Sequence, residues 1–128
     1  MREMSHPREI LLGSQARFIS LPVCDHYCGV EARINKSLAL QAELSHEFGT
    51  CVIDVTLDCE DGAPVGGEIE HANMLVSSIN NAYNATKIIA IHAPDKTRPR
   101  IAVRVHAIDH PAFETDIEII VTQVGHHL

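Results

Sequence analysis

Segments with the apolar spacing of a β-strand alternate along this chain with segments that have the spacing of an α-helix, and this alternation restricts the fold more than any other feature. The clearest strand pattern covers residues 51–59, where apolar side chains occupy every second position. A helical pattern follows each of three strand patterns. Strands that are separated by helices need crossover connections, so this order predicts an α/β fold with a parallel sheet.

Turn residues and changes of apolar spacing set the expected bounds of these elements. Strands are expected at residues 18–23, 51–59 and 101–106, and helices at residues 30–48, 67–81 and 113–124. Residues 24–29 are expected to form a turn, and residues 87–92 fit either a short strand or an irregular segment. The buried side of the first helix is predicted from the four-residue spacing of Ile34, Leu38 and Ala42.

The expected sheet has its three strands adjacent and parallel, in chain order. Successive side chains of a strand point to opposite faces. In the second strand, Leu57 and Cys59 are therefore expected on the face that the helices cover, and Asp58 and Glu60 on the other face.

Length and charge narrow the class of protein. The 128 residues fit one domain, since domains usually have about 100–200 residues. The formal net charge of −7 argues against a nucleic-acid or anionic membrane partner, which needs clustered Lys and Arg. The longest apolar runs are about four residues, whereas a membrane span needs about 20. Residues 1–7 lead into no signal-peptide core, so we expect a cytoplasmic protein.

Two of the expected strands carry polar side chains on one side. These positions are Asp54, Thr56, Asp58 and Glu60 on the second strand, and Arg104 and His106 on the third. A parallel sheet is normally covered on both faces, and charges placed there must be paired or used. They also gather toward the carboxyl ends of the strands, where α/β folds place active sites. A functional site, a structural network of arginine and carboxylates, and a solvated face are all compatible with this pattern.

Several motifs of the sequence resemble one known family. Residues 58–63, Asp-Cys-Glu-Asp-Gly-Ala, resemble the Asp-Leu-Glu-Asp-Ala signature of the citrate lyase β-subunit and malyl-CoA lyase family, the CoA-ester lyase branch of the HpcH/HpaI aldolase superfamily. Residues 103–106, Val-Arg-Val-His, are similar to that family's third strand, usually Val-Arg-Val-Asn. Residues 109–116 resemble the turn and acidic helix start that follow it, and residues 34–38 are similar to its Ile-Glu-Lys-Ala-Leu.

Three features depart from the family pattern. His106 stands where the family usually has Asn, and Gly62 follows the acidic motif. The turn at residues 24–29 is longer than the family's Phe-Val-Pro-Gly-type turn, which predicts a different CoA-phosphate loop.

The resemblance implies the N-terminal three βα units of a TIM (β/α)8 barrel with parallel strands. Such a barrel needs eight βα units over roughly 200 or more residues, whereas this sequence supplies three. We therefore expect a truncated barrel, which forms a single partial domain over residues 1–128, with a lead-in at 1–16 and βα units at about 17–49, 50–82 and 100–125. A self-contained small α/β domain is the alternative.

The resemblance also implies a carbon–carbon lyase or aldolase of the CoA-ester type that acts on a small acyl-CoA or 2-oxo acid. Mg²⁺ would assist a retro-aldol or Claisen cleavage as a Lewis acid, with its main ligands outside this chain, so no metal ligand is assigned here. We expect a homo-oligomer in the full-length form and an inactive fragment in this chain alone. The alternatives are a non-catalytic half-barrel and a CoA-independent class II aldolase, which typically has a Glu-His pair where this chain has Glu60 and Asp61.

The family motifs assign roles to five residues. Arg104, Glu60 and Asp61 are the expected catalytic residues, with Arg104 holding a carboxylate or stabilising an enolate oxygen. Glu60 and Asp61 would orient this arginine and metal-bound water. The expected substrate-binding residues are Arg104, Asp58 and Lys36. A salt bridge from Arg104 to Asp58 or Glu60 would suit a structural role and a catalytic role equally.

Overall fold

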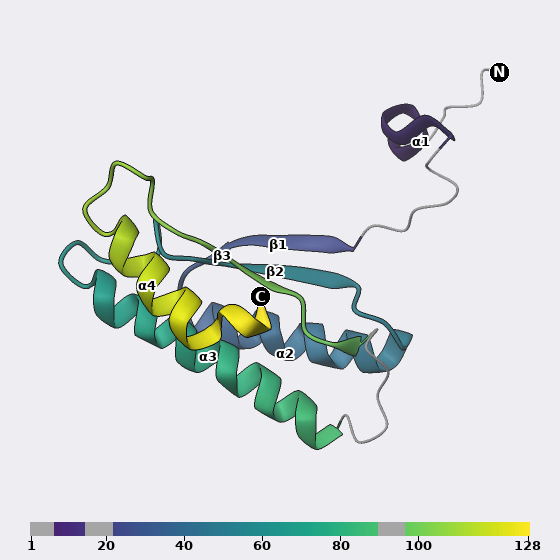
Figure 1. The fold of residues 1–128 in the computed structure, drawn as a ribbon. Coiled ribbons are helices and arrows are strands. Elements are labelled where there is room, and N and C mark those ends of the chain that lie inside the picture. Colours follow the sequence, from purple (N-terminus) through teal and green to yellow (C-terminus); the bar gives the residue numbers. More distant parts are fainter. Residues whose placement is uncertain (1–6, 15–21, 90–96) are drawn as a thin grey trace.

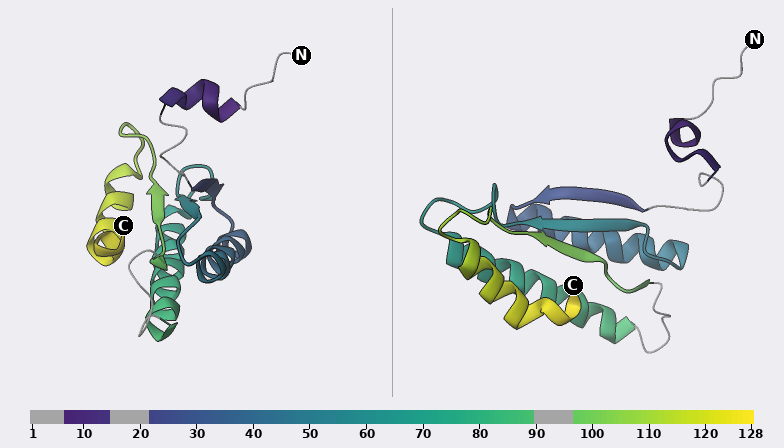
Figure 2. Two further views of the ribbon diagram at one scale, coloured as in Figure 1. Left: turned by 90° about the vertical axis from the view of Figure 1, so that its right-hand side faces the viewer. Right: turned by 45° about the horizontal axis from the view of Figure 1, so that its top comes forward.

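The computed structural model describes residues 7–14, 22–89 and 97–128. Its elements, in chain order, are α1 (Pro7–Leu12), β1 (Val23–Cys28), α2 (Glu31–Phe48), β2 (Ile53–Asp58), α3 (Glu68–Ile89), β3 (Ile101–Arg104), α4 (Phe113–Val124) and the 3₁₀ turn η3 (Gly125–His127). Figures 1 and 2 show α1 apart from the layered body that the other elements form. None of the helices in these ranges is long and apolar enough to cross a membrane.

The three strands form one parallel sheet in the order β1, β2, β3, which confirms the expected α/β topology. In the β2–β3 register, Val55 lies opposite Ile101, and Asp58 lies opposite Arg104. The β1–β2 register shifts between Asp25 and the end of β1. The β2–β3 ladder continues past the strand ends, where the Cys59 N–H donates to the Arg104 carbonyl oxygen at 2.8 Å.

Helices α2, α3 and α4 all lie on one side of the sheet, and within the described residues no helix covers the other side (Figure 1; Figure 2, left). The core forms between the sheet and these helices. Its largest fully buried apolar side chains are Ile34, Val55, Leu57, Cys59, Leu75, Ile79 and Val124. Burying one such aliphatic side chain contributes about 1.5–3 kcal/mol. Leu57 and Cys59 therefore face the helices, as the alternating pattern predicted.

The first strand lies later in the chain than expected. Residues 24–29 were predicted as a turn, but β1 occupies Val23–Cys28, and residues 18–21 of the predicted strand lie outside the described part. The prediction was wrong because β1 is an edge strand, and none of its side chains that the structure describes, those of residues 23–26, is fully buried. Val23, Cys24 and His26 are all exposed, so no apolar alternation marks the strand in the sequence.

Helix α3 is longer than the expected helix at residues 67–81. It continues to Ile89, so residues 87–89 are helical rather than a strand or an irregular segment, and residues 90–92 lie outside the described part. The extension is stabilised by Tyr83, which is buried one turn beyond Ile79 on the same side of the helix. The Tyr83 hydroxyl lies 2.9 Å from the Pro99 carbonyl oxygen and 2.5 Å from that of His127.

Helix α2 buries two polar side chains that its apolar spacing did not predict. Ile34 and Leu38 are buried as expected, but Gln41 and Ser45 follow them into the interior, while Ala42 is exposed. The Gln41 amide nitrogen donates to the carbonyl oxygens of Ile53 and Arg100, both at 2.8 Å. This side chain therefore joins the start of β2 to the start of β3.

Replacing Gln41 with methionine, which has a similar length and no amide, tests this role. Gln41 is only 2% exposed, and the substitution removes one of two donors from each carbonyl oxygen, since the Val55 N–H still donates to Arg100 and the Cys51 thiol to Ile53. With two hydrogen bonds lost, we expect the free energy of unfolding to fall by about 1–3 kcal/mol. Urea denaturation measures the change, and Glu43→Met on the exposed side of the same helix is the control. An equal loss in both variants would contradict the role of the two hydrogen bonds.

Candidate functional site

A two-point ion pair joins β2 to β3 at the carboxyl ends of the strands. Arg104 Nε lies 2.9 Å from Asp58 Oδ1, and Arg104 Nη2 lies 2.8 Å from Asp58 Oδ2. The pair forms because the two residues are directly opposite in the parallel register. The Asp58 side chain is 1% exposed and the Arg104 side chain 26% exposed. The guanidinium is therefore the part of this pair that solvent can reach.

The loop after β2 folds around the Asp58 carboxylate. The Glu60 N–H donates to Oδ1 at 3.0 Å, and the Asp61 N–H donates to Oδ2 at 3.2 Å. The Asp61 carboxylate returns to the guanidinium, with its Oδ2 2.5 Å from Arg104 Nη2, although the Asp61 side chain is 72% exposed. Arg104 thus contacts two carboxylates, which leaves the three groups with a net negative charge.

The surroundings shift the pKa values of the paired groups. Burial raises the pKa of Asp58, but the Arg104 hydrogen bonds and charge, together with the two loop N–H groups, outweigh it and hold that pKa below its usual value. The hydrogen bonds from Arg104 to Asp58 raise the pKa of the guanidinium, with a smaller contribution from Asp61. Both members of the pair therefore stay charged over the neutral range.

Two contacts hold the loop against the rest of the structure. The buried His71 ring from α3 places Nε2 2.7 Å from the Asp58 carbonyl oxygen, so Nε2 carries the proton and donates it. Gly62 meets Gly29 from the β1–α2 connection, and a Cβ on Gly29 would lie 2.6 Å from the Gly62 Cα. This close approach explains Gly62, which stood out as a departure from the family pattern.

The structure brings three of the five expected site residues together: Asp58, Asp61 and Arg104. Glu60 contributes only its backbone N–H among the described contacts, and its side chain is exposed. Lys36 lies on the exposed side of α2, because Ile34 and Leu38 turn the opposite side of that helix into the core. We call Asp58, Asp61 and Arg104 the polar cluster. It forms without the side chains of Glu60 and Lys36.

A second arginine–carboxylate pair lies on the same open side of the sheet. Arg100 Nε is 2.9 Å from Asp54 Oδ1, so the arrangement of Asp58 and Arg104 recurs four residues, or two repeats of the pleat, earlier along the chain. Arg100 was not predicted as part of the polar stripe, since it precedes the expected strand. The structural network of arginine and carboxylates thus exists, and it includes the candidate site residues.

His106 lies beyond β3, because the strand ends at Arg104, and it therefore does not continue the polar side of that strand. Its ring Nδ1 lies 2.5 Å from Asp116 Oδ2, and its backbone N–H donates to the same oxygen at 3.0 Å. Both residues are buried, and the His106 ring stacks on that of His110 at a centroid distance of 4.2 Å. Asp116, placed by the sequence in the first turn of a helix, thus joins α4 to the chain after β3.

Cys59 is a buried thiol of the core. Burial, together with the charges of Asp116 and Asp58, raises the pKa of Cys59 to about 12. The thiolate is the nucleophilic form of cysteine, and it is scarcely populated at neutral pH under these conditions. The cysteine within the acidic motif therefore packs rather than reacts.

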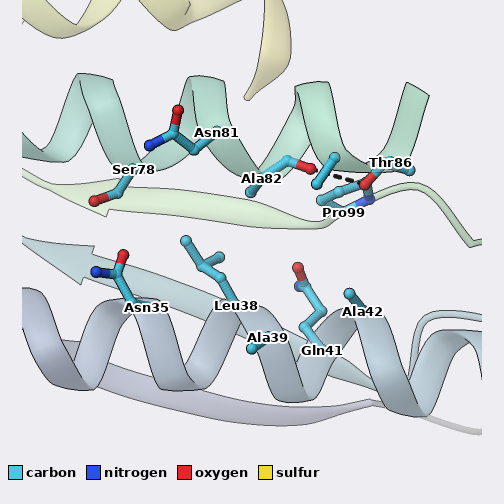
Figure 3. A pocket seen from close by; sticks show the side chains of 11 residues that line it. Asn35, Leu38, Ala39, Gln41, Ala42, Ser78, Asn81, Ala82, Thr86 and Pro99 are labelled. Atoms are coloured by element: carbon cyan, nitrogen blue, oxygen red, sulfur yellow. Dashed lines mark hydrogen bonds between the residues drawn. The ribbon is translucent and has the colours of Figure 1, made fainter. Parts of the chain in front are cut away.

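A separate groove runs between α2 and α3, with a volume of about 190 Å³ (Figure 3). Its lining consists of Asn35, Leu38, Ala39, Gln41, Ala42, Ser78, Asn81, Ala82, Ala85, Thr86 and Pro99. In Figure 3 the α2 side chains face those of α3 across the groove, and the Thr86 hydroxyl donates to the Ala82 carbonyl oxygen at 2.8 Å. These helices lie on the side of the sheet opposite to Arg104, so the groove is not part of the polar cluster.

The polar cluster does not fit Mg²⁺ by itself. Within residues 7–14, 22–89 and 97–128, no group of three or more His, Cys, Asp and Glu side chains is placed to hold a metal ion. Mg²⁺ requires several oxygen ligands in octahedral geometry. The oxygens of Asp58 already accept hydrogen bonds from Arg104 and from the loop, and Asp61 also accepts one from Arg104.

Comparison with known proteins supports the resemblance seen in the motifs. The chain is similar to the solved structure of a citrate lyase from Burkholderia xenovorans LB400, with 38% sequence identity and a TM-score of 0.56. The alignment covers 82% of this chain and 28% of that protein, so the chain spans less than a third of its length. Searches against models of protein families and against functionally curated proteins found no match. The likeness supports the superfamily and does not distinguish its branches.

The contact between the two loops predicts that Gly29→Ala destabilises the protein. The new Cβ would lie 2.6 Å from a backbone atom of Gly62, so the loop after β2 has to move. We expect a loss of about 1–3 kcal/mol in the free energy of unfolding, measured by thermal denaturation. Gly125→Ala is the control, because its Cβ would meet only two Val121 side-chain atoms, at 3.4 and 3.8 Å. Equal melting temperatures for the two variants would contradict the tight contact.

The lowered pKa of Asp58 predicts a loss of stability in acid. As the pH falls, the unfolded chain takes up a proton near the usual pKa of 3.8, before the folded chain does. The stability from this carboxylate is therefore complete above that value and is lost as the pH falls through the lower, folded pKa. Urea unfolding from about pH 6 to about pH 2 should show this loss, with a flatter dependence in Asp58→Asn. Asp109→Asn, at an exposed loop carboxylate, should keep the wild-type dependence.

Proposed function

We propose that this chain carries part of the active site of a carbon–carbon lyase or aldolase of the CoA-ester type. One observation supports this most: the guanidinium of Arg104 is partly exposed at the carboxyl ends of two parallel strands, oriented by a buried carboxylate. The residues of this pair lie in the two motifs that resemble the CoA-ester lyases. The likeness to a citrate lyase at 38% identity supports a lyase or aldolase chemistry.

In this proposal, Arg104 binds the carboxylate of a 2-oxo acid and stabilises the negative charge that develops as the carbon–carbon bond breaks. A guanidinium binds carboxylates through two parallel hydrogen bonds, which gives orientation as well as affinity. Asp58 fixes the plane and the direction of that guanidinium. Charge stabilisation of this kind works best when the donor is already oriented before the reaction begins.

We propose further that the open side of the sheet is the inner face of a larger barrel. The polar residues of β2 and β3 face this side, and no described helix covers it. The chain corresponds to 28% of the length of the citrate lyase it resembles, which leaves room for further strands in a whole protein of that kind. A homo-oligomer, a cytoplasmic location and an acyl-CoA substrate belong to the same proposal.

Mg²⁺ enters this proposal only with ligands from outside the cluster described above. Its chemical contribution would be that of a Lewis acid on the 2-oxo acid. The role of Arg104 does not depend on it, because binding a carboxylate by a guanidinium needs no metal. Arg104 can therefore be tested alone.

Arg104→Lys separates a substrate-binding role from a purely structural one. Lysine keeps the positive charge next to Asp58 but lacks the planar fork, so we expect the affinity for pyruvate or glyoxylate to fall about tenfold or more. Titrations followed by NMR measure this affinity. In any form of the protein with lyase activity, turnover should fall by about 10²–10³.

If Arg104 only neutralises Asp58, the lysine variant should have a lower melting temperature and an unchanged affinity for the 2-oxo acid. That result would remove Arg104 from the proposed active site and leave it as part of the ion-pair network.

A further inference from the structure

We propose that Asp61 occupies the position on Arg104 that an anionic substrate takes, and that it must swing aside before the 2-oxo acid binds. Asp61 would then act as an internal competitor that sets the affinity of the site. This inference rests on the anion-binding role proposed above for Arg104.

The hydrogen bonds of the guanidinium carry the geometric argument. Asp58 uses the edge formed by Nε and one Nη2 hydrogen, and Asp61 uses Nη2 as well. A guanidinium has one further edge that can bind a carboxylate through two hydrogen bonds, and that edge runs from Nη1 to Nη2. A substrate carboxylate that binds through Nη2 meets the Asp61 carboxylate at the same nitrogen. The two anions therefore compete for Arg104.

The two aspartates differ in how firmly they are held. Asp58 is buried and accepts two loop N–H groups in addition to the guanidinium, so it cannot leave without losing all of these contacts. Asp61 is 72% exposed, and its carboxylate is free to turn into water. An exposed ion pair changes an equilibrium constant by about fivefold at most. A substrate can therefore displace Asp61 but not Asp58.

The charge of the cluster favours an exchange over a simple addition. Two carboxylates beside one guanidinium already leave a net negative charge, which repels a further anion. If the Asp61 carboxylate leaves as the substrate carboxylate arrives, the number of charges in contact with Arg104 stays the same. The neutral pair of Asp58 and Arg104 then serves as the receiving unit.

Pyruvate titrations of the full chain, followed by the NMR signal of the Arg104 Nε–H group, test this inference. Asp61→Asn and Asp61→Ala should each tighten pyruvate binding by about fivefold. Asp109→Asn makes the same chemical change at an exposed carboxylate on another loop, and it should change the affinity by less than about twofold. Arg104→Lys removes this reporter group, so its pyruvate affinity is followed through backbone amide signals near residue 104, and it should fall by about tenfold or more.

If wild-type protein binds pyruvate at Arg104 but neither Asp61 variant binds more tightly, the competition is wrong and the anion-binding role stands. Equal tightening by Asp109→Asn would likewise overturn the competition, since it would show a general effect of charge. If pyruvate perturbs Arg104 in none of the proteins, the anion-binding role fails, and the competition fails with it.

Discussion

The ion pair between Asp58 and Arg104 is the interaction on which the polar cluster depends. A carboxylate that is 1% exposed is stable only when its charge is balanced and its oxygens accept hydrogen bonds. Removing Arg104 would leave this buried carboxylate without its opposite charge, which is strongly unfavourable. The same carboxylate also binds the N–H groups of Glu60 and Asp61, so it shapes the loop that carries the acidic motif. A slip of one residue between β2 and β3 would turn Arg104 to the other face and undo the whole arrangement.

The spacing of apolar residues in the sequence was enough to predict those helices and strands that have one apolar, buried side and one polar side. In β2 apolar and polar residues alternate in the sequence, and α4 matches its predicted range of 113–124. A salt bridge from Arg104 to Asp58 or Glu60 was also expected, because a period of two places polar residues of neighbouring strands on one side, and the structure selects Asp58. The edge strand β1 lacks this alternation of apolar and polar residues. It was expected at residues 18–23, which is too early in the chain.

The supporting contacts of the cluster were beyond local patterns, because their partners are distant in the sequence. Asp116 fits the first turn of a helix by its charge alone, and only the structure shows that it binds His106. Nothing near His71 in the sequence indicates that its ring meets the Asp58 carbonyl oxygen. The need for glycine at position 29 likewise arises from Gly62, which is brought close by the crossing of two loops.

The side of the sheet that no described helix covers restricts what can be placed against it. Two arginine–aspartate pairs, Asp54 with Arg100 and Asp58 with Arg104, lie along it, with Thr56 between them. Apolar packing would strip water from these charges, which is less favourable than leaving them hydrated. A polypeptide layer that closed over this side would have to supply hydrogen-bonding groups or trap water, and its hold would weaken as salt is added. One sheet thus has a dry side governed by packing and a hydrated side governed by charge.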